Sequence, residues 1–84
     1  MAVDLSAMRK LYKKGGLKAA IVSPAPMQKG WELIVVRTDG KQDYMTVARS
    51  DRRKIYKSLE SVHLDAKRVG FVEVTTQVET MQVA

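Results

Sequence analysis

The chain has 84 residues, no cysteine and a formal net charge of +6, with 15 Lys and Arg against 9 Asp and Glu. This length allows one domain, residues 1–84, with a small core, and the lack of cysteine excludes disulfides and thiolate metal sites. A hydrophobic fraction of 45% is typical of a folded chain. No apolar stretch approaches the length of a membrane span, and the N-terminus lacks a secretory signal pattern, so we expect a cytoplasmic protein.

Residues 4–14 are predicted to form a helix. Their apolar positions recur with a 3.6-residue period and are Leu5, Met8, Leu11 and Tyr12. Asp4 is suited to the N-cap position, because its carboxylate accepts the free N–H groups of the first turn. Gly15 and Gly16 follow two lysines and supply the residue types that commonly end a helix.

Three segments with strand character come next. Residues 17–23 form a short apolar run that ends in a loop with two prolines. Residues 31–37 are rich in β-branched side chains and give the clearest strand. Asp39-Gly40 is typical of a two-residue type I′ loop, after which residues 43–48 return as the second strand of a hairpin.

A two-residue loop fixes the register of this hairpin. Val36 is then opposite Asp43, and Trp31 shares a face with Tyr44. Both faces of the ribbon would be largely apolar, so each needs a cover. We expect the second helix on one face, and the N-terminal helix or a second copy of the protein on the other, and we favour a homodimer.

Residues 50–70 allow two interpretations. Apolar residues keep helical spacing from 55 to 69, which permits one long helix. Alternatively, residues 49–52 form a turn and 53–57 a third strand, and Ser58 then caps a shorter helix over 59–69. We favour the second interpretation, because Ser58 followed by Glu60 is a good helix start. Gly70 ends the helix in both.

Residues 71–77 alternate as a last strand, and 78–84 are expected to be a loose tail. The predicted fold class is therefore α+β: a small antiparallel sheet with an N-terminal helix and a second helix followed by a last strand.

Catalysis is not expected from these residues. His63 is the single histidine, and no cysteine and only scattered carboxylates accompany it. Glu60 and His63 are spaced i, i+3 on the predicted helix, but two ligands are too few for a metal site. We expect an exposed His63, with no metal, cofactor or small-molecule substrate.

The basic residues gather in two segments, one free of acids and one containing Asp51 alone. Their members are Arg9, Lys10, Lys13, Lys14 and Lys18 in the first, and Arg49, Arg52, Arg53, Lys54 and Lys57 in the second. Such clusters are typical of a surface that binds a polyanion, and we expect nucleic acid, without excluding simple solvation of the surface. Arg52, Arg53 and Lys54 form the densest cluster.

Aromatic side chains are weaker candidates for contact with nucleic acid. Trp31 and Tyr44 on one predicted face could stack bases, although a single Trp at the start of a strand more commonly belongs to the core. Tyr56, between Lys54 and Lys57, is the better candidate for an exposed ring.

Three stretches carry a resemblance to a group of known proteins. They are residues 44–49 (YMTVAR), 53–62 (RKIYKSLESV) and 68–71 (RVGF). Together they resemble small accessory proteins of plasmids and other mobile elements, over about residues 31–76. The resemblance implies a β-β-β-α-β unit and a role in DNA maintenance or transfer, so DNA rather than RNA, and it assigns no functional residue.

The main alternative is a protein–protein adaptor, or a dimerising subunit of a larger assembly, that uses an apolar sheet face. Salt dependence separates the two, because phosphate binding weakens steeply as salt rises.

Overall fold

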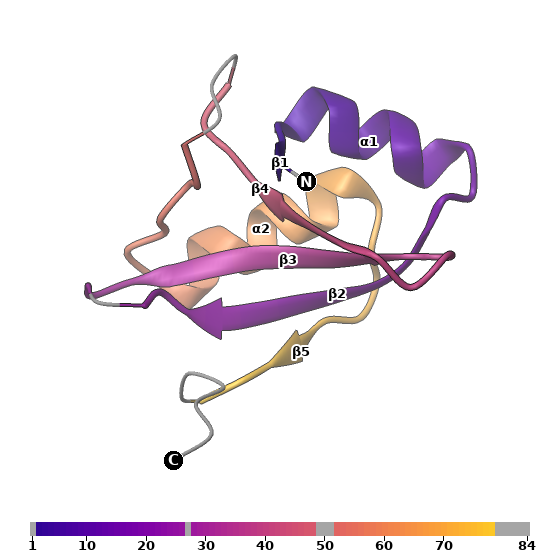
Figure 1. Cartoon of the computed structure of the whole chain (residues 1–84). Helices are drawn as coiled ribbons and strands as arrows, with labels where there is room; N and C mark the ends of the chain where they lie inside the picture. Colours follow the sequence, from indigo (N-terminus) through magenta and orange to yellow (C-terminus); the bar gives the residue numbers. More distant parts are fainter. Residues whose placement is uncertain (1, 27, 49–51, 79–84) are drawn as a thin grey trace.

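The computed structural model describes residues 2–26, 28–48 and 52–78 (Figure 1). Its elements in chain order are β1 (Ala2–Val3), α1 (Leu5–Lys13), β2 (Leu17–Pro24), β3 (Trp31–Arg37), β4 (Gln42–Met45), α2 (Leu59–Val69) and β5 (Thr75–Thr76). The strands form one sheet in the order β1-β4-β3-β2-β5. This confirms a small α+β fold with an N-terminal helix and a later helix.

The sheet is mixed, whereas an antiparallel sheet was predicted. The three central strands, β2, β3 and β4, are antiparallel as expected. The two-residue strands at the edges run parallel to their neighbours, β1 beside β4 and β5 beside β2. β1 was not predicted at all, because two residues are too short to carry a period.

Helix α1 begins and ends where its local signals predict. The backbone N–H of Ala7 donates to the carboxylate of Asp4 at 2.9 Å, which confirms Asp4 as the N-cap. Lys14 is the C-cap, and Gly15 follows it with a φ of +76°. Met8 anchors the helix, because it is fully buried.

The segment before α2 follows the second of the two interpretations. Ser58 accepts a hydrogen bond from the N–H of Ser61 at 3.2 Å and caps α2, and Gly70 ends it, so the single long helix is wrong. The predicted third strand is reduced to two isolated bridges, Arg53 with Thr46 and Tyr56 with Trp31. Most of the predicted turn, residues 49–51, lies outside the described residues.

The hairpin loop between β3 and β4 holds three residues, 38–40, instead of the predicted two. The N–H of Arg37 donates to the carbonyl of Lys41 at 2.7 Å and closes the loop. The N–H of Gly40 donates back to the carbonyl of Arg37, and Gly40 has a φ of +91°, which confirms its expected positive φ. A three-residue loop that ends in such a glycine is the next most common hairpin connection.

The longer loop shifts the register by one residue. Val35 pairs with Asp43 and Ile34 with Tyr44, so the predicted pairing of Val36 with Asp43 is wrong. A one-residue shift moves every β4 side chain to the other face of the sheet. Asp43 therefore lies on the face of Val35, and Tyr44 on the face of Ile34.

Both helices pack on one face of the sheet. The buried core between these layers consists of Met8, Leu17, Ala20, Val22, Leu33, Val35, Met45, Tyr56, Val62, Ala66 and Val69. Helix α1 contacts α2, and α2 contacts β2 and β3; in Figure 1, α2 runs behind β3 and β4. Of the two covers expected for the second face, the N-terminal helix is therefore wrong, and a second copy of the protein stays a prediction.

The second face of the sheet, which we call the open face, carries half-buried apolar side chains. They are Ala19, Ile21, Ile34, Val36 and Tyr44. Ile34 pairs with Ile21 on one side and with Tyr44 on the other, so these three form a row across β2, β3 and β4. Within the described chain, neither helix covers this row.

Two further strands are shorter than predicted. The predicted strand over residues 43–48 ends at Met45, and only Thr75–Thr76 of residues 71–77 pair with the sheet. Val78 is 86% exposed, as expected of the predicted tail, and residues 79–84 lie outside the described chain.

We predict that Gly30→Ala destabilises the fold far more than Gly40→Ala. Both glycines have positive φ, but a Cβ at Gly30 would lie 2.6 Å from Ile55 Cγ2 and 2.8 Å from the carbonyl oxygen of Tyr56. A Cβ at Gly40 meets nothing within 4 Å. We expect losses of roughly 3 kcal/mol or more and about 1 kcal/mol in the free energy of unfolding, measured with urea. Equal losses would show that residues 55–56 do not lie against Gly30.

Candidate nucleic-acid interface

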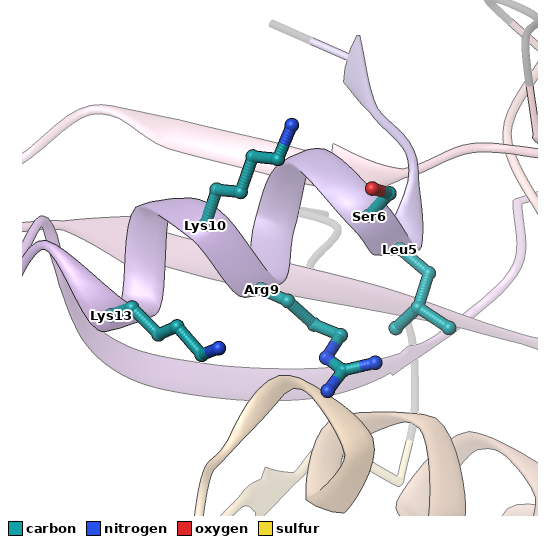
Figure 2. A pocket seen from close by; sticks show the side chains of 5 residues that line it. All are labelled: Leu5, Ser6, Arg9, Lys10 and Lys13. Carbon is teal, nitrogen blue, oxygen red and sulfur yellow. The ribbon is translucent and has the colours of Figure 1, made fainter.

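Helix α1 presents a cationic hollow at its surface. Figure 2 shows the lining side chains, which are Leu5, Ser6, Arg9, Lys10 and Lys13. Arg9 and Lys13 are four residues apart and therefore lie on one face of the helix, one turn from each other. In the view, their side chains leave the helix on one side and that of Lys10 on the other.

The charges along α1 are not neutralised within the described chain. No ion pair there involves Arg9, Lys10, Lys13, Lys14 or Lys18, and α1 itself contains no acidic residue. Arg9, Lys10, Lys13 and Lys14 are exposed. Lys18 is also exposed but lines a different hollow near Glu73, and Lys14 is not among the residues that line the α1 hollow. The structure therefore brings together only Arg9, Lys10 and Lys13.

Two members of the second predicted basic segment, Arg53 and Lys54, form internal ion pairs. The guanidinium of Arg53 lies 3.1 Å from the carboxylate of Glu32 and 4.0 Å over the ring of Tyr44. The ammonium of Lys54 lies 2.9 Å from the carboxylate of Asp65. Arg52 and Lys57 are exposed, and Arg49 lies outside the described residues.

Asp65 binds a lysine of the predicted basic segment, and the sequence did not predict this role. Its side chain is 3% exposed and accepts hydrogen bonds from the hydroxyl of Tyr56 at 2.6 Å, from Lys54 at 2.9 Å and from Arg68 at 3.0 Å. Burial raises the pKa of Asp65, but the bonds from Tyr56 and Lys54 outweigh burial and hold it below the ordinary value. The signal was present, because Asp65 lies on the apolar face of its helix beside Ala66.

Lys54 connects this network to the surface of α1. A second hollow includes Leu5 and Ser6 of α1 together with Lys54, and it is completed by Asp4, Met45, Thr46, Val47 and Ala48. Leu5 and Ser6 line both hollows, so the two hollows adjoin each other. The second hollow is not cationic, because it contains the carboxylate of Asp4 and its one basic side chain, Lys54, is paired with Asp65.

Two of the proposed aromatic contacts are corrected by the structure. Tyr44 lies on the open face, whereas Trp31 packs against the core, so they do not share a face. The register shift is the cause. Tyr56 is 4% exposed, so its expected exposure is wrong, because Asp65 draws its hydroxyl inward.

His63 is exposed as predicted, and its Nε2 lies 3.1 Å from the hydroxyl of Thr76. Over residues 2–26, 28–48 and 52–78, no group of three or more His, Asp or Glu side chains is arranged to hold a metal ion. Over the same residues, no helix has the length and apolar character needed to cross a bilayer.

A scan against models of protein families, a search of curated proteins and a search of solved structures each gave no match for this chain.

We predict that Tyr56→Phe lowers the free energy of unfolding by about 2 kcal/mol at neutral pH, because a buried carboxylate loses a hydrogen bond. The loss should shrink as the pH falls below about 4. The folded-state pKa of Asp65 is lowered, so its stabilising effect is present above the ordinary carboxyl pKa and disappears as the pH drops through the folded value. Urea unfolding at several pH values measures both effects.

Tyr12→Phe is the matched control. The ring of Tyr12 packs edge-on against Phe71, and within the described chain its hydroxyl makes no hydrogen bond, so we expect a change below about 0.5 kcal/mol at every pH. If both variants behave alike, the phenol of Tyr56 does not support Asp65.

Proposed function

We propose that this protein is a non-catalytic nucleic-acid-binding protein that holds phosphates with the cations of α1. The observation that supports this most is the state of Arg9, Lys10 and Lys13. They line one hollow, they are exposed, and no described acid neutralises them. The cations of the second segment that pair with buried acids are less available, because freeing them would leave a buried charge without a partner.

A cluster of this kind binds through counterion release. Each Lys or Arg that neutralises a phosphate displaces condensed cations, so the affinity falls steeply with salt. Phosphate contacts carry no information about base sequence. We therefore expect similar affinities for unrelated sequences.

The resemblance of residues 31–76 to accessory proteins of mobile elements favours DNA over RNA as the partner. It also suggests a role in plasmid or mobile-element maintenance. The same proposal assigns the protein to the cytoplasm, where such DNA is found, and requires neither a cofactor nor a small-molecule substrate.

We predict that the triple variant Arg9→Gln, Lys10→Gln, Lys13→Gln loses most of its affinity for DNA. Glutamine keeps a high helix propensity, so the charge is removed without breaking α1. The slope of log K against log salt should flatten by about 2.7 units, which is 0.9 for each of three lost phosphate contacts. Fluorescence anisotropy with a labelled duplex at several salt concentrations measures the slope.

A second triple variant provides the control: Lys29→Gln, Lys41→Gln, Lys67→Gln. It removes the same net charge from exposed positions outside the hollow. We expect its salt slope to match that of the parent. If both variants lose affinity equally, binding depends on the net charge of the protein and not on the α1 hollow. Parent protein that binds vesicles of anionic lipid but no DNA would contradict the proposal.

A second candidate function is that of an adaptor or dimerising subunit, and the open face favours it. The row of Ile21, Ile34 and Tyr44 lies on the side of the sheet away from both helices. The charged groups beside it, Glu32 and Arg53, neutralise each other. A second copy of this positively charged chain could approach this face with little electrostatic repulsion.

We predict that, if this second function holds, the parent forms a dimer that salt does not dissociate and that Ile34→Thr weakens. Sedimentation equilibrium at high micromolar concentration measures the association. Leu64→Gln is the control, because Leu64 is 47% exposed on α2 and lies away from the open face. A parent that remains monomeric would exclude the homodimer.

A further inference from the structure

We propose that the nucleic acid bound by α1 is a duplex, held by its phosphate backbone with no base stacked on the protein. This inference rests on the proposed function and deepens it. Proteins that bind single strands combine a cationic groove with aromatic rings on which bases stack. Single-strand binding of this kind would need an aromatic ring that is free to stack on a base.

The sequence contains five aromatic residues, and three of them make specific contacts with other side chains of the fold. Tyr12 and Phe71 pack against each other edge to face, with ring centroids 4.9 Å apart and planes at 72°. Both rings pack against the core but are only partly buried, and they line a surface hollow together with Lys18 and Glu73. The carboxylate of Glu73 in that hollow opposes the approach of a nucleic acid. Tyr56 is 4% exposed and donates its hydroxyl to Asp65.

The other two aromatic rings are also occupied. Trp31 packs against the core, and its backbone N–H and carbonyl both pair with Tyr56 at 2.8 Å. Tyr44 faces outward on the open face, but the guanidinium of Arg53 lies 4.0 Å over its ring. The ion pair with Glu32 holds Arg53 there, so a base would have to displace it.

The dimensions of α1 suit a phosphate backbone. Nine residues rise about 13 Å, which matches roughly four successive phosphates of one strand at about 3.4 Å of helix axis each. The three cations of the hollow lie within a little over one turn of this length, about 6 Å along the helix axis. The surface next to them is Ser6 and Leu5, which offers a small hydroxyl and no ring.

Electrostatics then favours the duplex by a modest factor. The salt exponent per phosphate contact is about 0.9 for duplex DNA and about 0.7 for a single strand. For two forms that bind equally at 1 M salt, three contacts give a difference of roughly 0.6 in log K at about 0.1 M salt, or about fourfold. One stacked base would reverse this order, because stacking strengthens single-strand binding by roughly 5- to 150-fold per base.

The test compares one duplex of about 16 base pairs, roughly four times the length that α1 spans, with its own single strand, chosen to lack self-pairing. Fluorescence anisotropy at about 0.1 M salt should show duplex binding about fourfold tighter. The emission of Trp31, the only tryptophan, should not change when the single strand is added. Tyr44→Leu should leave both affinities unchanged.

The outcomes separate this inference from the proposed function. A single strand that binds as tightly as the duplex or tighter, quenching of Trp31, or weakened single-strand binding by Tyr44→Leu would each overturn the inference and leave nucleic-acid binding intact. Binding of neither form would overturn the proposed function as well. If the duplex is preferred and the α1 triple variant loses that binding, both stand.

Discussion

The carboxylate of Asp65 connects parts of this fold that backbone hydrogen bonds join only weakly. The chain between β4 and α2 contacts the sheet through single bridges at Arg53 and Tyr56. Asp65 binds Tyr56 and Lys54 of that segment to α2, and its own side chain is buried. A buried carboxylate is costly unless several donors satisfy it, and here three do. Asp65 therefore holds the segment against α2, while backbone hydrogen bonds to Trp31 and Met45 hold it against the sheet.

The same principle governs the distribution of charge over the molecule. Three acids are buried, Glu32, Asp43 and Asp65, and each accepts a bond from a basic side chain that remains partly exposed. Each pair uses a cation that would otherwise add to the surface potential. Helix α1 contains no acid and contacts none of these three through its basic side chains. The three basic side chains of α1 are therefore outside these pairs, as are the exposed Lys29, Lys41 and Lys67 elsewhere on the surface.

Much of the fold could be predicted because the signals act locally. Asp4, Ser58 and Gly70 mark helix ends through bonds that reach at most four residues along the chain. The hairpin register could not be read this way. Asp39-Gly40 suits both a two- and a three-residue loop, and the choice between them places Asp43 on the core face, where Arg37 binds it.

In the candidate site, too, local features could be predicted and contacts between distant residues could not. The cations of α1 were predicted as a group because one helix carries them, and a helix keeps its residues together. The ion pairs of the second segment join residues 21 and 11 positions apart, Arg53 with Glu32 and Lys54 with Asp65, and no local pattern reveals them. The burial of Glu32 follows from its place in β3, but its partner is known only once the chain has folded.

The positions of α1 and of the open face have one further consequence. Helix α1 packs on the core side of the sheet, and the open face is the other side. Two copies joined through their open faces would therefore turn both α1 surfaces outward, away from each other. Such a dimer could not place both helices on one short stretch of backbone, and it would instead connect two separate segments of nucleic acid. Bivalency would then raise the apparent affinity only for long or looped DNA, because a short duplex cannot reach both surfaces at once.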